Sequence, residues 1–179
     1  MTFFKDYYQN IFDLLNTIDE KEILNVVRII KNVNSKNGKL IIVGNGGSAA
    51  IASHLSIDFT KAAKIRAINF NESSLLTCFS NDFGYENWVE KSLEYYADKS
   101  DMVILISSSG NSKNILNGAF KAKKMELPLV TFSGFGSSNE LKELGNYNFW
   151  VDSKDYNLVE TVHQTWALSI IDYLIMDQG

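Results

Sequence analysis

The segment KLIIVGNGGSAAIASHL, residues 39–55, decides the fold because it changes from one structural period to another within a few residues. Residues 40–43 are a short unbroken run of apolar and mostly β-branched side chains, which is typical of a buried strand. A glycine cluster follows at Gly44, Gly46 and Gly47, and the alanine-rich remainder can continue as a helix. The segment therefore predicts a strand, a tight loop and a helix in direct succession.

Similar apolar runs recur further along the chain as RAINF (66–70), MVILIS (102–107), LPLVTF (127–132) and YNFWV (147–151). A segment able to hold a helix separates each run from the next, which is the alternation expected of a parallel sheet. Helical spacing of apolar residues also covers 3–18 and 20–35. We therefore predict one α/β domain over residues 1–179. Its parts are an N-terminal helical hairpin (1–36) and a core with a five-stranded parallel sheet flanked by helices (37–179).

The composition limits the classes of protein to which the chain can belong. Of its 179 residues, 45% are hydrophobic and 21% charged, which is ordinary for a soluble globular protein, and the net charge is −4. We therefore expect neither a membrane span nor a nucleic-acid partner. The first residues lack the pattern of a signal peptide, and a single cysteine, Cys78, excludes an internal disulfide. Both features predict a cytoplasmic protein.

Two loops follow predicted strands and have the composition of anion-binding sites. In GNGGSAA, residues 44–50, glycines permit a tight turn, and the amides at the start of the next helix attract an anion. This loop also fits a dinucleotide pattern through Gly44, Gly46 and Ala49, but no acidic residue stands cleanly at the end of the next strand. The second loop, SSSGNS at 107–112, has four hydroxyls before a helix. Simple helix capping explains only part of this run, so we favour a phosphate site.

Four motifs, GNGGSA, SNDFGYE (80–86), SSSGNS and VETVH (159–163), occur in the order and spacing of the sugar isomerase (SIS) domain family, which the chain resembles over nearly its whole length. The resemblance implies a flavodoxin-like sheet and a homotetramer with shared active sites. It also implies an aldose to ketose isomerase acting on a sugar phosphate, most closely sedoheptulose 7-phosphate, in heptose and surface polysaccharide precursor synthesis. The substrate-binding residues that it implies are Asn45, Gly46, Ser48, Asp82, Ser107, Ser108, Ser109 and Ser112.

The candidate catalytic residues lie on two predicted helices. His54 and Asp58 are four residues apart, about 40° around a helix axis, so both can face one way and bind a metal or move protons. By resemblance Asp58 stands where the family has a glutamate proposed as the base. Glu160 and His163 are the candidates for the acid, because Leu168 occupies the position of the family's proposed acid, a histidine. The resemblance implies no obligatory cofactor, but it allows zinc at His54, Asp58 and Glu160.

Leu168 also keeps a second interpretation open. A leucine cannot donate a proton, so the chain could be a catalytically diverged SIS module that binds a phosphosugar or regulates a partner. The two interpretations differ in whether a bound sugar phosphate is converted.

Overall fold

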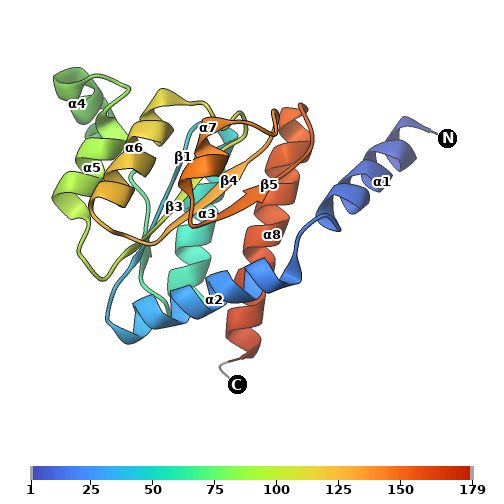
Figure 1. Ribbon diagram of the computed structural model, residues 1–179, viewed down its shortest axis with the longest axis horizontal. Coiled ribbons are helices and arrows are strands. Elements are labelled where there is room, and N and C mark those ends of the chain that lie inside the picture. The colour runs from blue at the N-terminus through green and yellow to red at the C-terminus, as the bar shows by residue number, and fades with distance from the viewer. Residues whose placement is uncertain (1, 178–179) are drawn as a thin grey trace.

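The computed structural model describes residues 2–177, and the parallel sheet at its centre confirms the predicted fold class. The strands are β1 (Leu40–Gly44), β2 (Ala67–Ile68), β3 (Met102–Ser107), β4 (Leu129–Ser133) and β5 (Tyr147–Trp150). They lie in the order β2-β1-β3-β4-β5, and all neighbouring strands are parallel (Figure 1). This is the flavodoxin-like order, in which the direction of winding reverses between β1 and β3.

The edge strand β2 is shorter than the run predicted at 66–70. The Thr60 hydroxyl donates to the carbonyl oxygen of Ala67 and accepts from its backbone N–H, both at 3.2 Å. The carboxamide oxygen of Asn69 then accepts from the backbone N–H of Asn71 at 2.9 Å, which turns the chain away from β1. The Thr60 bonds thus hold Ala67 within β2, and the strand ends at Ile68, directly before the turn at Asn69.

Helices connect the strands and cover both faces of the sheet. None within residues 2–177 combines the length and the apolar character that crossing a bilayer requires. The helices are α1 (Phe3–Leu15), α2 (Glu20–Ser35), α3 (Gly47–Lys61), α4 (Ser73–Phe83), α5 (Trp88–Tyr96), α6 (Lys113–Lys124), α7 (Glu140–Leu144) and α8 (Tyr156–Met176).

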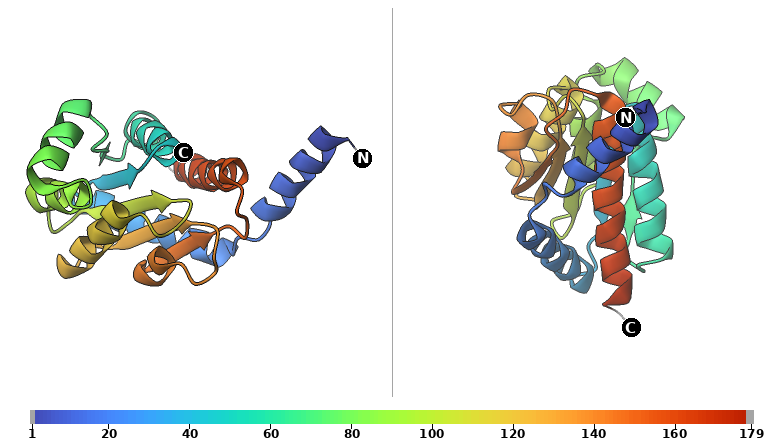
Figure 2. Two further views of the ribbon diagram at one scale, coloured as in Figure 1. Left: turned by 90° about the horizontal axis from the view of Figure 1, so that it is seen from above. Right: turned by 90° about the vertical axis from the view of Figure 1, so that its right-hand side faces the viewer.

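Two hydrophobic clusters, one on each face, form the core. Side chains of α2, α3 and α8 pack on one face of the sheet, and those of α5, α6 and α7 pack on the other. The result is a three-layer arrangement with the sheet in the middle (Figure 2). Both faces are covered, which explains why the central strands read as unbroken apolar runs.

The first helix, α1, projects from the body of the molecule (Figures 1 and 2). It contains no buried residue, and its large side chains Phe3, Phe4, Tyr8 and Phe12 are 60–73% exposed. Its end is held by α8, because the indole N–H of Trp166 donates to the carbonyl oxygen of Leu15 at 3.0 Å. An aromatic surface is therefore presented on an extended arm.

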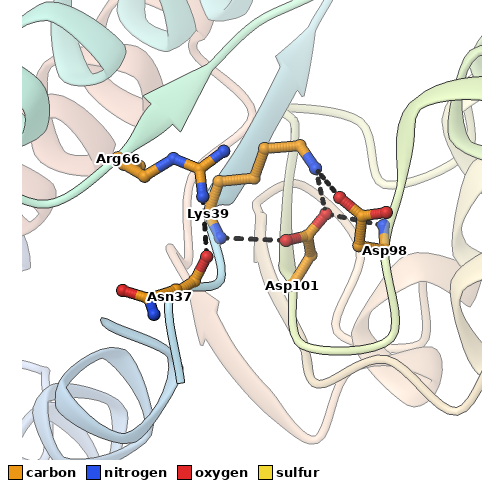
Figure 3. Close-up of polar contacts among 5 residues, drawn as sticks. All are labelled: Asn37, Lys39, Arg66, Asp98 and Asp101. Carbon is orange, nitrogen blue, oxygen red and sulfur yellow. Dashed lines mark hydrogen bonds and ion pairs between the residues drawn. The ribbon is translucent and has the colours of Figure 1, made fainter. Parts of the chain in front are cut away.

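A charged cluster joins the amino ends of β1, β2 and β3, at the edge of the sheet opposite to the glycine and serine loops (Figure 3). The Lys39 ammonium donates to Asp101 at 2.5 Å and to Asp98 at 2.9 Å, and the backbone N–H of Lys39 donates to Asp101 at 2.9 Å. Burial alone acts to lower the pKa of Lys39, but the hydrogen bonds and charges of Asp101 and Asp98 outweigh it and raise that pKa. Arg66 donates to the carbonyl oxygen of Asn37 at 2.7 Å beside them.

Candidate active site

The glycine loop and the serine loop lie together at the carboxyl edge of the sheet. Gly44 at the end of β1 pairs with Ile106 in β3, so the two loops leave neighbouring strands at the same level. A switch point between such strands is where open parallel sheets bind ligands. The two loops and α8 enclose a cavity of about 330 Å³, which we call the loop cavity. It is lined by Asn45, Gly46, Gly47, Ser48, Ile106, Ser107, Ser108, Ser109, Ser112, Tyr156 and Glu160.

Hydroxyl groups of the serine loop are available to a ligand. The Ser108 hydroxyl is buried and has no hydrogen-bond partner within residues 2–177. Ser112 stands at the N-cap of α6, yet its side chain makes no capping hydrogen bond; its hydroxyl lies 3.3 Å from that of Ser107. Simple capping therefore does not account for this loop. An anion would satisfy these hydroxyls together with the first amides of α6.

The side chain of Asn45 is fixed by hydrogen bonds to two residues, Asn114 and Tyr85, that the sequence alone did not connect with it. Its carboxamide and that of the buried Asn114 form a reciprocal pair of hydrogen bonds, each 2.9 Å long. The Tyr85 hydroxyl donates to the same Asn45 oxygen at 3.1 Å. Tyr85 lies in the SNDFGYE motif, while Asn114 lies in α6. Their joint action depends on tertiary contacts that no local pattern in the sequence reveals.

Glu160 is the residue that joins the loop cavity to a second space. It lines the loop cavity and also a cavity of about 570 Å³, which we call the helix cavity, between α1, α3 and α8. Burial raises the pKa of the Glu160 carboxyl, which favours its protonated form. The carboxyl group lies against Gly47: a Cβ atom at that position would be 2.1 Å from Glu160 Oε2. Only glycine at position 47 leaves room for the Glu160 carboxyl group.

His54 and Asp58 meet as their spacing predicted. The His54 Nε2 atom lies 3.1 Å from Asp58 Oδ2, and His54 lines the helix cavity with Tyr7 and Gln164. Asp58 itself lines neither the loop cavity nor the helix cavity, and its link to the site is its contact with His54. On the other side of the ring, His54 Nδ1 lies 3.1 Å from the amide nitrogen of Gln164. Gln164 was not singled out from the sequence, because its partner is 110 residues away.

The residues predicted to hold zinc are not assembled as a metal site within residues 2–177. No group of three His, Cys, Asp or Glu side chains is placed there to hold an ion. His54 and Asp58 lie together, and Glu160 is not gathered with them. Two neighbouring ligands are fewer than the three or four protein ligands of a zinc site, so the arrangement within residues 2–177 does not fit a bound zinc ion.

His163 lies away from both cavities, so its position does not support the prediction that it supplies the acid. The ring is completely buried, and its Nε2–H donates to the carbonyl oxygen of Ser133 at 2.9 Å, while Nδ1 has no partner within residues 2–177. Burial lowers the pKa of His163 to about 4, although the bond to Ser133 acts in the opposite direction. His163 is therefore a neutral residue of the interior between α8 and β4.

This buried ring predicts a pH dependence of stability. The unfolded chain binds a proton at His163 below about pH 6.5, whereas the folded chain does so only below about pH 4. Between these values the unfolded state holds more protons, so stability should fall with falling pH, by about 3 kcal/mol in total. Urea unfolding at fixed protein concentration should show this slope. The His163→Gln variant should lose it, and an identical slope in both proteins would contradict the assignment.

Asp82 and Leu168 also lie apart from the two cavities. Asp82 is exposed on α4 and accepts a hydrogen bond from Asn81 at 2.9 Å. Its charge raises the pKa of the neighbouring Cys78 thiol. Leu168 is half-buried and packs against the hydrophobic cluster that contains α2, α3 and α8. Within one chain, the structure thus brings neither residue to the loop cavity.

The fold and this site define a class of protein: α/β domains with a serine-rich loop at the switch point of a parallel sheet ordered 2-1-3-4-5. A family model described as the SIS domain matches residues 4–134. The chain therefore belongs to the SIS domain family, and within that family to the group of phosphoheptose isomerases, as its relatives show.

One such relative is a phosphoheptose isomerase of Fusobacterium nucleatum, 33% identical over 175 residues, which cover 92% of this chain and 90% of the relative. Among solved structures, a phosphoheptose isomerase from Neisseria gonorrhoeae superposes with a TM-score of 0.87 at 20% identity, covering 96% of this chain and 94% of that one. A second, from Francisella tularensis, gives 0.87 at 23% identity, with coverages of 99% and 95%. These two structures confirm the fold.

Proposed function

We propose that the chain is an aldose to ketose isomerase acting on a sugar phosphate, with sedoheptulose 7-phosphate as the substrate and heptose precursor synthesis as its role. The observation that carries the proposal is the loop cavity, which is lined by the Glu160 carboxyl and by a buried Ser108 hydroxyl that has no partner within residues 2–177. The names of relatives such as the Fusobacterium nucleatum protein support the choice of substrate.

The serine loop would bind the phosphate group. Hydroxyls of Ser107, Ser108, Ser109 and Ser112 and the amides at the start of α6 can donate hydrogen bonds to phosphate oxygens without a metal ion. Asn45 and Ser48 line the same cavity and would contact the sugar. The loop cavity alone, at about 330 Å³, suits the phosphate end, and the sugar would extend past Glu160 toward the helix cavity.

In the reaction, Asp58 would act as the base and Glu160 as the acid. Asp58 takes the proton from C1 of the ketose, the C–H electrons form a C1=C2 bond, and protonated Glu160 gives its proton to the carbonyl oxygen on C2. The enediol then loses the proton of its C1 hydroxyl to Glu160, and C2 takes back the proton held by Asp58. The raised pKa of Glu160 suits the acid of the first step.

Turnover of sedoheptulose 7-phosphate, followed by NMR with and without added zinc, tests this function. We expect the aldose product to form, and the proposal is wrong if the sugar phosphate binds but is not converted. That outcome would favour the second candidate, a phosphosugar-binding or regulatory module. The half-buried Leu168, packed in the core where the family has its proposed acid, is the observation that favours it.

The Gly47→Ala variant tests whether the position of Glu160 matters. The added Cβ atom would lie 2.1 Å from Glu160 Oε2, so the carboxyl group must move, while alanine itself suits the first turn of α3. We expect kcat to fall about ten- to a hundredfold with little change in stability. Gly136→Ala is the matched control, since no atom lies within 4 Å of a Cβ there. Equal kcat values for both variants would contradict the expectation.

The chain would act as a homotetramer with shared active sites. The exposed aromatic side chains of α1 support an assembly, because four large rings on a projecting helix are a costly surface to leave in water. Tyr7 on the same helix lines the helix cavity, so a partner packed on α1 would lie next to the site. The mass of the protein in solution, measured by light scattering, tests this state.

A further inference from the structure

Gln164 connects the two helices that carry the candidate catalytic residues. It lies on α8 four residues after Glu160, so both side chains point to the same side of the helix. Its amide nitrogen reaches across to α3 and lies 3.1 Å from His54 Nδ1. His54 Nε2 in turn lies 3.1 Å from Asp58 Oδ2. The three side chains form one continuous line from α8 to the proposed base.

These contacts are consistent with only one arrangement of hydrogens on a neutral His54. A neutral imidazole has one N–H donor and one nitrogen that accepts. The Gln164 amide nitrogen can only donate, so His54 Nδ1 is the acceptor of that hydrogen bond. The hydrogen of the neutral ring is then on Nε2, which lies 3.1 Å from Asp58 Oδ2.

This arrangement leaves a single free proton acceptor in the line. His54 Nδ1 is occupied as an acceptor and Nε2 carries the hydrogen, so neither ring nitrogen offers a free lone pair. Asp58 Oδ2 lies 3.1 Å from Nε2, while Asp58 Oδ1 has no hydrogen-bond partner within the part of the chain that the structure describes. The contacts thus direct base catalysis to Asp58 rather than to His54. Without the Gln164 donor, His54 could place its hydrogen on Nδ1 and turn a lone pair toward the carboxylate, which is repulsive.

We propose that Gln164 is a positioning residue of the isomerase site, which holds His54 as the Nε2–H tautomer so that His54 orients Asp58 as the base. This role rests on the proposed isomerase function. The next residue at the same spacing on α8, four positions after Gln164, is the aliphatic Leu168, which cannot make a hydrogen bond to His54. Four polar residues of α8 line the helix cavity, and Gln164 is the one that bonds to His54. The other three are Asn157, Glu160 and Thr161.

Two variants of Gln164 separate the proposal from a general effect on structure. Gln164→Leu removes the donor, and Gln164→Glu replaces it by an acceptor that demands a hydrogen on His54 Nδ1. Labelling histidine with ¹⁵N distinguishes protonated from unprotonated ring nitrogens, and only two histidines are present. In the wild-type protein, well above the pKa of free histidine, we expect Nδ1 of His54 to be unprotonated. In Gln164→Glu it should become protonated, with the ring of His163 unchanged.

Variants that change the tautomer of His54 should also change the rate of isomerisation. For both variants we expect kcat to fall about ten- to a hundredfold with KM nearly unchanged, because a misdirected base weakens the chemical step and not the phosphate contacts. Asn34→Asp, an amide to carboxylate change at an exposed position of α2, should leave kcat and both histidine spectra as in the wild type.

The possible outcomes are distinguishable. Absence of turnover in the wild-type protein would overturn the isomerase function and with it the catalytic role of Gln164, whatever the spectra show. Wild-type turnover together with a protonated Nδ1 in His54, or with unchanged kcat in both Gln164 variants, would overturn the positioning role alone. A loss of kcat with an unchanged tautomer would overturn it as well, since the effect would then come from elsewhere.

Discussion

The Glu160→Gln variant should lose nearly all isomerase activity, with kcat reduced by about 10²- to 10⁴-fold. The substitution preserves the shape of the side chain that lies against Gly47, but an amide cannot exchange a proton with the substrate oxygen. Of the other two candidates on α8, His163 is fully buried against β4 and Leu168 is aliphatic, so neither can replace this acid. The rate of conversion of sedoheptulose 7-phosphate, measured by NMR at saturating substrate, checks this result.

Binding should survive in the same variant. The phosphate contacts come from the serine loop, which Glu160 faces but does not bond to within residues 2–177. Calorimetric titration with the sugar phosphate should therefore give a dissociation constant close to that of the wild type. Glu143→Gln, at an exposed position of α7, is the control for the change of charge. A Glu160→Gln protein with wild-type kcat would show that the acid is another group.

The contrast between Glu160 and His163 shows how far the spacing of residues can locate a site. Two helix positions that are three residues apart point only about 60° away from each other. The sequence alone therefore could not decide whether Glu160 or His163 faces the ligand. The rotation of α8 against the sheet decides it. In the structure this rotation buries the apolar stripe that includes Val159, Val162 and Trp166, and His163 is carried inward with that stripe. Glu160, at its margin, remains at the cavities.

The fold was more predictable than the site because its strands are defined locally. The runs at 102–107 and 147–151 match β3 and β5 to within a residue. For β3 the reason is that a strand covered on both faces needs continuous apolar sequence. The two loops were also predictable, because glycine and serine clusters follow β1 and β3 directly. By contrast, Gln164 and Asn114 act through partners on other elements, and no periodicity of the chain encodes those contacts.

Asp101→Asn should lower the free energy of unfolding by about 3 to 5 kcal/mol, the largest stability effect expected outside the apolar core. Asp101 is 1% exposed, and it accepts hydrogen bonds from the ammonium and the backbone N–H of Lys39 and from the backbone N–H of Asp98. An asparagine keeps one acceptor oxygen but turns an NH₂ group toward these donors. It also leaves the Lys39 ammonium, on a residue only 8% exposed, without its closest counter-charge. Urea unfolding at fixed protein concentration measures the loss.

Asp98→Asn tests whether the effect comes from burial and not merely from one fewer negative charge. Asp98 bonds to the same ammonium at 2.9 Å, but its side chain is 76% exposed, so water can replace the lost interaction and the change should be much smaller. The double variant Lys39→Met with Asp101→Leu removes both buried charges together and should recover most of the stability lost in Asp101→Asn. If the two single aspartate variants were equally destabilised, solvent exposure would not govern this cluster. If the double variant did not recover, the cost would come from the freed backbone N–H groups of Lys39 and Asp98, because only these remain unpaired once both charges are gone.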